Sequence, residues 1–405
     1  MSEIAHPAPD GWLKRFFLSL VILALLAGLL LVPWAVCWLT ASGELDQEEV
    51  VARQAQGEFV LFGPGLAQDI MAYKLALYAA VKPEVVVLGS SRAGNVRAAF
   101  FERPFVNMAG AATDLESLRL LVDRMLAVHR PRVVLLGLDF WWLTAGAPAG
   151  RPERIVQPSL LDASTLRAPW RWLVQGRIAP ADMLAPLQHR LRADRYGLEA
   201  QLRDTGYGPD GSLYEGAVLD GRRPAPDHAF ARTLRELESG SGVWAGSLAP
   251  DRERLEAFAE ICCRLRSRGI RTIVFLPPLA TPVLGALADR NGGDAGWLSA
   301  LRQGLLDCGV ESMDFSDPRV YGSGDCEMMD GLHGGDVIGA SLVRDMGDRQ
   351  PWLRDMLHRE YLSHVLRERR GLAAVPDERL TDLPEADFLG LHCAKKRRGE
   401  ATPRF

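Results

Sequence analysis

An apolar stretch near the N-terminus places the strongest limit on how this chain can fold. Residues 16–39 contain no charged side chain, and about 20 apolar residues are enough to cross a bilayer as a helix. Trp34 and Trp38 are of a type that favours the membrane–water interface. The sequence therefore predicts a transmembrane anchor over residues 16–40, after a cytoplasmic N-terminus of residues 1–15.

The charges on either side of this stretch indicate its orientation. Lys14 and Arg15 precede it, whereas Glu44 and Asp46 follow it. Because Lys and Arg stay on the cytoplasmic side, we expect a single-pass protein of the cytoplasmic (inner) membrane with its bulk extracytoplasmic or periplasmic. The alternative is a cleaved signal peptide with a cut near residues 41–43. The stretch is, however, longer than the roughly 7–15 apolar residues of a signal core.

Apolar runs alternate with helical patterns in the rest of the chain. Runs of β-branched and aliphatic residues predict buried strands at residues 84–88, 104–107, 132–136, 271–276 and 310–315. Helices are expected from Ala93, over 113–128 behind a capping-box pattern, over 251–268, and over 337–346 with Asp336 as the cap. This alternation predicts an α/β fold, namely a doubly wound parallel sheet with helices on both faces.

The same patterns divide the chain into segments. Residues 41–80 are expected to form a tether with a lead-in helix at 66–80, and residues 81–345 to form the main domain. An insertion over 144–250 is rich in Pro, Gly and Arg and has weak periodicity. It either covers the carboxyl edge of the sheet and selects substrate, or is a surface elaboration. Residues 346–405 are expected to be helical and then polar, with a basic, solvated tail at 395–398.

Composition and cysteine spacing exclude several classes of protein. A net charge of −4 argues against a general nucleic-acid binder. The six cysteines show no zinc or redox spacing, and no Gly-x-Gly-x-x-Gly follows the first strand, so we expect no metal and no cofactor. Outside the cytoplasm Cys308 and Cys326 could pair, although spacing alone does not establish this.

A serine turn follows the first predicted strand. The run at 85–88 ends in Gly89-Ser90-Ser91-Arg92, and ligands collect beyond the carboxyl ends of parallel strands. A serine hydroxyl there can act as a nucleophile, while N–H groups at the start of the next helix face a developing anion. Taken alone, the turn fits a helix-capping loop better than a catalytic site.

A late Asp-x-x-His pattern supplies the partners that a nucleophilic serine needs. Asp330 and His333 lie after the last predicted strand and before the last helix of the sheet, at the same edge as the serine turn. A histidine can remove the serine proton when a carboxylate fixes its tautomer. The histidines after residue 100 other than His333 lie at a helix end, in the insertion or in the tail.

In these blocks the chain resembles the SGNH (GDSL-like) hydrolase superfamily, and in particular its membrane-anchored branch similar to DltD and alginate O-acetylation proteins. The resemblance covers about residues 82–140 and 251–345. It implies a flavodoxin-like sheet, with Ser91 rather than Ser90 as nucleophile and Asp330 and His333 completing a catalytic triad. The family's second block is matched by residues 107–110, where Gly110 becomes the oxyanion-hole candidate and Asn107 a substrate-binding candidate.

The third sequence motif of the family differs in this chain. Members usually have Gly-x-Asn, and the Asn side chain donates to the oxyanion; this chain has Asp139 in that place. An ionised carboxylate cannot donate a hydrogen bond. Asp139 then either orients a neighbour or binds substrate hydroxyls, or the oxyanion hole uses backbone N–H groups alone. Arg92 is a second substrate-binding candidate, for an anionic group, or forms an ion pair within the fold.

The resemblance implies an extracytoplasmic serine-dependent O-acyltransferase or acylesterase that acts on a cell-envelope glycan or polymer. A polytopic membrane O-acyltransferase would be the partner on the donor side. Transfer and hydrolysis share the acyl-enzyme step, so the sequence does not separate them. The alternative is a non-catalytic scaffold or glycan-binding component of an envelope acyl-modification machine, which would account for the missing Asn and the large insertion.

Overall fold

A five-stranded parallel sheet forms the centre of the protein in the computed structural model, which describes residues 10–145, 157–245, 249–290, 296–375, 377–381 and 383–395. Its strand order is β3-β2-β4-β8-β9, and every neighbouring pair is parallel. The strands are β2 (Val85–Leu88), β3 (Phe105–Asn107), β4 (Val133–Gly137), β8 (Arg271–Leu276) and β9 (Glu311–Asp314). The predicted parallel sheet is confirmed.

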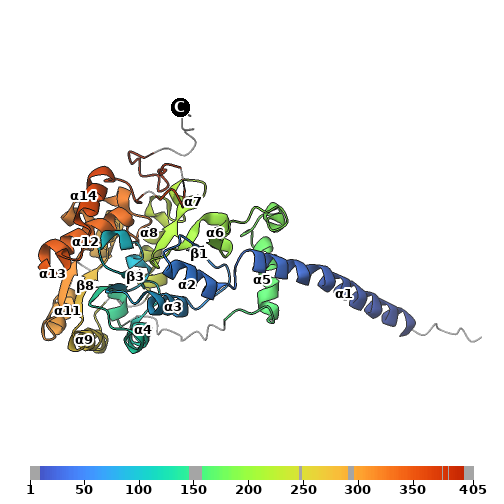
Figure 1. Cartoon of the computed structure of the whole chain (residues 1–405), viewed down its shortest axis with the longest axis horizontal. Coiled ribbons are helices and arrows are strands. Elements are labelled where there is room, and N and C mark those ends of the chain that lie inside the picture. The colour runs from blue at the N-terminus through green and yellow to red at the C-terminus, as the bar shows by residue number, and fades with distance from the viewer. Residues whose placement is uncertain are drawn as a thin grey trace, which may run out of the picture.

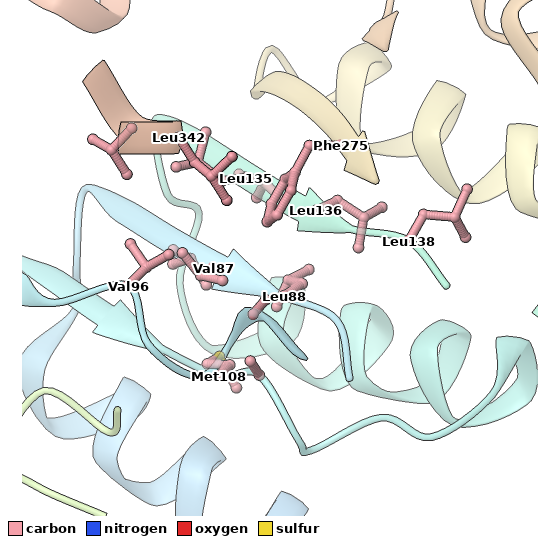
Figure 2. Packing of buried hydrophobic residues seen from close by; sticks show 14 of the residues in the cluster. Val87, Leu88, Val96, Met108, Leu135, Leu136, Leu138, Phe275 and Leu342 are labelled. Carbon is pink, nitrogen blue, oxygen red and sulfur yellow. The ribbon is translucent and has the colours of Figure 1, made fainter. Parts of the chain in front are cut away.

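The central strands are apolar on both faces because helices flank the sheet. Every residue of β2 and β4 is buried, as expected for a parallel sheet that is covered on both sides. Figure 2 shows side chains of β2 and β4 packed with Phe275 of β8 and Leu342.

In Figure 1 the helices lie on either side of the strands. One layer comprises α3 (Ile70–Val81), α4 (Leu115–Val128), α9 (Arg252–Ser267) and α11 (Gly296–Leu306). The other comprises α12 (Asp336–Arg349), α13 (Pro351–Arg354) and α14 (Arg359–Glu368).

The helix predicted from Ala93 does not form. Only short 3₁₀ turns, Ser91–Ala93 and Ala98–Phe100, separate β2 from β3. The reason lies in the carbonyl groups of this segment, since a helix would use them for its own hydrogen bonds. The Asn107 side-chain amide instead donates to the carbonyls of Ala93 and Val96, and the Leu213 N–H of the insertion donates to the carbonyl of Gly94.

Two helix starts differ from the prediction by one residue. The capping box of α4 pairs Asp114 with Ser117, whose N–H and hydroxyl exchange hydrogen bonds with it, rather than Thr113 with Glu116. At α12 the cap is Gly335 and Asp336 is the first helical residue. The Asp336 carboxylate accepts from the Arg97 guanidinium at 2.9 Å, so a long-range ion pair replaces the expected local cap.

The described part of the insertion is folded, and the first and last residues of the insertion lie side by side. A bridge between Thr144 and Pro250 joins its two ends. Within it and the segment before β2, four short strands form a second sheet of order β5-β1-β6-β7. These strands are β1 (Leu61–Phe62), β5 (Arg195–Tyr196), β6 (Thr205–Tyr207) and β7 (Leu213–Glu215). The helices of the insertion are α5 (Ala163–Val174), α6 (Leu198–Arg203), α7 (Gly216–Leu219) and α8 (Ala231–Ser239). Outside it, α10 (Thr281–Arg290) packs on α8.

The expected tether over 41–80 is instead part of the folded body. Helix α2 (Gln47–Ala55) packs on α3, which begins four residues later than the helix predicted at 66–80. The buried Glu44 carboxylate accepts hydrogen bonds from the N–H groups of Gly65, Leu66 and Leu198. These bonds fix the chain directly after the N-terminal helix.

The N-terminal helix α1 (Asp10–Ala41) is long and apolar enough to cross a membrane. Its last turns, however, are packed against the protein, with Ala35, Trp38 and Leu39 fully buried. From Ala35 onward one side of the helix is therefore covered by the protein, within the segment predicted to span the membrane. Residues 1–9 lie outside the described part of the chain.

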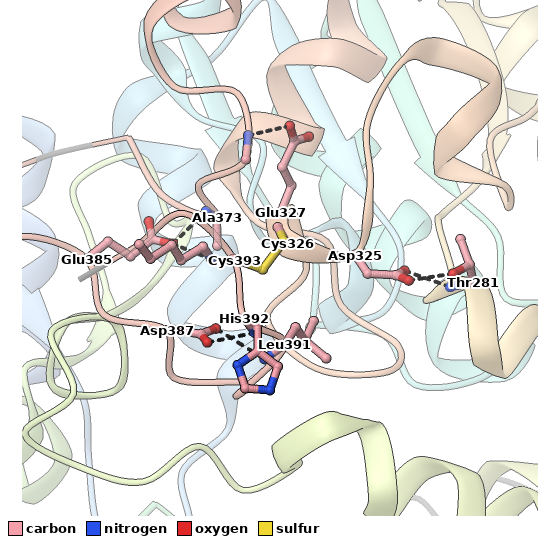
Figure 3. Close-up of a disulfide and its surroundings, with 12 residues drawn as sticks. Thr281, Asp325, Cys326, Glu327, Ala373, Glu385, Asp387, Leu391, His392 and Cys393 are labelled. Atoms are coloured by element: carbon pink, nitrogen blue, oxygen red, sulfur yellow. Dashed lines mark hydrogen bonds and ion pairs between the residues drawn. A yellow bond between two sulfur atoms is a disulfide. The ribbon is translucent and has the colours of Figure 1, made fainter. Parts of the chain in front are cut away.

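Cys308 and Cys326, whose pairing the sequence left open, are not bonded to one another. Cys263 of α9 is bonded to Cys308, two residues after the end of α11, and Cys326 is bonded to Cys393. The second bond holds the C-terminal segment beside the loop that follows β9 (Figure 3). Lys395, the first residue of the predicted solvated tail, is buried in an ion pair of 2.6 Å with Glu385; residues 396–398 lie outside the described part.

Mass mapping of the intact protein tests this pairing. We expect peptides cross-linked through Cys263–Cys308 and Cys326–Cys393, because each pair lies within bonding distance in the folded chain. Cys262 is buried, so alkylation of this thiol should require unfolding. A peptide linking Cys308 to Cys326 would contradict the structure.

Candidate active site

Three side chains from opposite ends of the domain meet at the carboxyl edge of the sheet. The Oγ atom of Ser91 lies 2.9 Å from Nε2 of His333. On the other side of the ring, Nδ1 of His333 lies 2.9 Å from each carboxylate oxygen of Asp330. The predicted serine, histidine and aspartate thus form one continuous hydrogen-bonded relay, and Ser91 is exposed to solvent.

Local backbone geometry presents Ser91 rather than Ser90. Gly89 has a φ of +134°, and a Cβ atom there would lie 2.5 Å from the Gly137 carbonyl oxygen. Only glycine fits at this close approach of two strand ends. The Ser90 hydroxyl accepts from the Arg92 N–H at 3.2 Å and so caps the short turn. This leaves Ser91 as the hydroxyl that faces the imidazole.

The carboxylate of the relay is held in its ionised form. Oδ1 of Asp330 accepts the N–H groups of Leu332 and His333, each at 2.8 Å. Burial alone would raise the pKa of Asp330, but the neighbouring His333 and these donors lower it to about 2. Burial likewise disfavours the imidazolium, but the charge of Asp330, its hydrogen bond to the ring and the charge of Glu215 together outweigh burial and raise the pKa of His333 above its ordinary value. The pair can therefore take up a proton from Ser91.

Asp227 of the insertion positions the Asp330–His333 loop and was not found from the sequence. Its buried carboxylate accepts from the Gly331 N–H at 3.0 Å and from the Thr233 hydroxyl at 2.6 Å. A Cβ at Gly331 would lie 2.6 Å from the Thr233 side chain, so the two segments are in direct contact. No motif surrounds Asp227, and only the folded contact identifies it.

Arg92 and Asp139, both predicted as substrate-binding candidates, are buried against one another. Their side chains are 4% and 1% exposed, and Nη1 of Arg92 lies 2.8 Å from Oδ1 of Asp139. Of the roles open to Asp139, orienting a neighbour is the one that this contact fits. Arg92 forms the ion pair within the fold that was its alternative role, so neither side chain is available to bind substrate.

Asn107 and Gly110 also have structural partners. The buried Asn107 side chain donates to two carbonyls of the segment after Ser91 and accepts from the Ala109 N–H. The Gly110 N–H, predicted to face an oxyanion, donates to the Gly89 carbonyl at 2.9 Å. Its φ of +84° serves the turn after β3. Neither residue has the predicted role in this structure.

The insertion reaches the site from the side of β6 and β7. The pKa of Glu215, at the end of β7, is raised by burial, while the nearby His333 partly opposes this shift. The Tyr207 hydroxyl of β6 lies 3.7 Å from a Cβ built on Gly110. Of the two roles open to the insertion, covering the carboxyl edge is therefore the one observed for this hairpin. Among the described residues, no group of three or more His, Cys, Asp or Glu side chains could hold a metal.

Comparison with protein-family models, curated protein sequences and solved structures finds no match to this chain. The geometry and chemistry of the site therefore carry the functional argument.

Replacing Asp227 by Asn tests whether the insertion holds the relay loop. The amide cannot accept all the hydrogen bonds from Gly331, Thr233 and Arg232. We expect the free energy of unfolding to fall by about 2–4 kcal/mol, measured by urea denaturation. The matched change Asp289→Asn, at an exposed position, should stay within about 0.5 kcal/mol of the wild type. Equal losses in both variants would contradict the role of Asp227.

Proposed function

We propose that this protein is an extracytoplasmic serine-dependent O-acyltransferase or acylesterase of a cell-envelope glycan or polymer. The observation that carries the proposal is the relay of Ser91, His333 and Asp330, with both of its hydrogen-bonded contacts at 2.9 Å. Nucleophile, base and orienting carboxylate stand in the order that covalent acyl transfer requires.

The chemistry follows from this relay. His333 Nε2 takes the Ser91 proton as Oγ attacks the acyl carbonyl carbon, and the carbonyl π electrons move to its oxygen. Collapse of the tetrahedral intermediate breaks the bond to the leaving group, which receives the proton from His333, and leaves an acyl-serine. An acceptor hydroxyl, or water in an esterase, then gives its proton to His333 as its oxygen attacks the acyl carbon. The bond from that carbon to Ser91 Oγ breaks, and Oγ takes the proton back from His333. Asp330 stabilises the imidazolium in both halves of the reaction.

Membership of the SGNH superfamily remains part of this proposal. The strand order β3-β2-β4-β8-β9 corresponds to 2-1-3-4-5 in chain order, the flavodoxin-like arrangement. Ser91 follows β2, beside the switch point between β2 and β4 where such sheets bind ligands. Because the Gly110 N–H is occupied and Asp139 cannot donate, the proposed oxyanion donor is the backbone N–H of Ser91 at the start of its 3₁₀ turn.

The proposed location is the cytoplasmic membrane, with α1 crossing once and the domain outside. Lys14 and Arg15 precede the apolar part of α1, and the two disulfides fit an oxidising compartment. A polytopic membrane O-acyltransferase is the proposed donor-side partner. The occupied Gly110 N–H also favours a second candidate, a non-catalytic glycan-binding component of an acyl-modification machine.

Labelling of the full chain with a fluorophosphonate probe separates these two candidates. We expect the wild type to form a covalent adduct at Ser91, found by mass spectrometry, because the relay activates that hydroxyl. Ser91→Ala should abolish the adduct, and His333→Ala should slow its formation by about 10²–10⁴-fold. Ser267→Ala, which removes an exposed serine at the end of α9, is the matched control and should label at close to the wild-type rate. A wild type that labels no faster than Ser91→Ala would rule out the catalytic candidate.

The pH dependence of labelling tests the pairing of His333 with Asp330. The base must be neutral, so the rate should rise with pH through the pKa of His333, with a midpoint above 6.5. In Asp330→Asn the charge that raises this pKa is gone while burial remains, so the midpoint should move to lower pH. The maximal rate should also fall, by about 10²–10⁴-fold. An unchanged midpoint would show that Asp330 does not control the imidazole.

A further inference from the structure

A segment of the insertion packs against one side of the end of α1. This collar, residues 160–190, consists of α5 and a 3₁₀ turn, Pro180–Leu184. The Trp172 ring of α5 packs edge-on against Trp38 of α1 at a centroid distance of 5.7 Å. The Trp38 indole N–H donates to the Asp182 carbonyl at 3.3 Å. In Figure 1, α5 runs across α1 at the end where α1 joins the folded body.

The outer surface of the collar is unusually apolar. Leu161 is 94% exposed and Val174 is 88% exposed, which makes them the two most exposed large apolar residues described outside α1. Leu187 and Leu184 are exposed in the same segment. Single exposed apolar residues are common, but a group of them marks a surface that contacts a partner or a membrane.

Basic residues accompany these apolar side chains. Arg167 and Arg171 are exposed on α5, four residues apart and therefore on one face, and Val174 continues that face. The opposite face, with Ala168 and Trp172, is buried. Arginines beside exposed apolar residues are typical of helices that lie at a membrane surface and contact anionic headgroups.

The dimensions of α1 place the collar at the depth of the headgroups. The charge-free part from Phe16 to Trp34 spans about 28 Å at 1.5 Å per residue, close to the roughly 30 Å of a hydrocarbon core. Trp38 lies about 6 Å further along the helix. The collar packs at that level, and the hydrogen bonds of Glu44 fix this end of α1 to the domain.

We propose that the collar rests on the outer surface of the bilayer that α1 crosses. Leu161, Val174 and Leu187 enter the interfacial layer, and Arg167 and Arg171 contact anionic headgroups. This inference rests on the proposed membrane span of α1. Together with the fixed end of α1, the contact holds the domain in one orientation, with its relay at a constant height above the membrane.

Depth-dependent quenching in vesicles tests the contact. The full chain in a Cys37→Ser background is reconstituted in phosphatidylethanolamine–phosphatidylglycerol vesicles with one new thiol, Leu161→Cys or Val174→Cys, carrying an environment-sensitive dye. Val21→Cys in the middle of α1 reports the span, and Val320→Cys, 71% exposed on the main domain, is the matched control. We expect lipid-borne nitroxide to quench the collar positions several-fold more than Val320→Cys, and aqueous iodide to quench them several-fold less.

The outcomes separate the collar from the anchor. If Val21→Cys is quenched by lipid but the collar positions are quenched only by iodide, the anchor stands and the collar proposal is overturned. If neither quencher reaches the collar, protein covers it, which also overturns the proposal. If lipid does not quench Val21→Cys, the span itself fails. Replacing Arg167 and Arg171 together by Gln should reduce lipid quenching at Leu161→Cys, and an unchanged signal would remove the headgroup contact from the proposal.

Discussion

The ion pair between Arg92 and Asp139 is the interaction on which the carboxyl edge of the sheet depends. Besides Asp139, the Arg92 guanidinium donates to the carbonyls of Pro277 and Pro278, each at 2.7 Å, and to that of Leu332 at 2.9 Å. Arg92, which follows Ser91, thus connects the ends of β2, β4 and β8 to the loop of Asp330 and His333. Breaking a buried pair of this kind leaves an uncompensated charge, which costs about 3–5 kcal/mol. The position of His333 relative to Ser91 follows from this set of contacts.

Local sequence patterns were sufficient to predict those elements whose structure depends mainly on their own residues. The strands could be predicted because continuous apolar runs such as 85–88 have few other ways to be buried. The relay could be predicted because Ser91 and His333 each follow a strand and share one edge of a parallel sheet. The helix expected after Ser91 fails for a non-local reason. Its carbonyls bind Asn107 and Leu213, and no pattern within residues 91–100 reveals those partners.

The structure of the insertion could not be predicted for the same reason, namely that it depends on long-range contacts. Its strands are two or three residues long, too short for a period-two pattern to stand out from the surrounding Pro and Gly. One strand of its sheet, β1, comes from the segment expected to be a tether. Asp227 bonds to the Gly331 N–H, and Glu215 comes near His333, only because this sheet and the segment before α8 pack over the edge. Residues that position the relay could therefore not be identified from the sequence before the long-range contacts were known.

The Arg92–Asp139 pair also bears on the missing Asn. An isolated carboxylate at this position would repel an oxyanion formed at Ser91, but Arg92 at 2.8 Å compensates its charge. If the site is of the proposed SGNH type, Asp139 in place of Asn thus removes one donor without adding net negative charge to the site. With the Gly110 N–H bound to Gly89, the proposed oxyanion donor is the backbone N–H of Ser91, because the N–H groups of Arg92 and Ala93 donate to Ser90. In the proposed reaction, loss of one oxyanion donor lowers the rate by about 10²–10³-fold, and it does so for transfer and for hydrolysis alike because both pass through the same acyl-enzyme step.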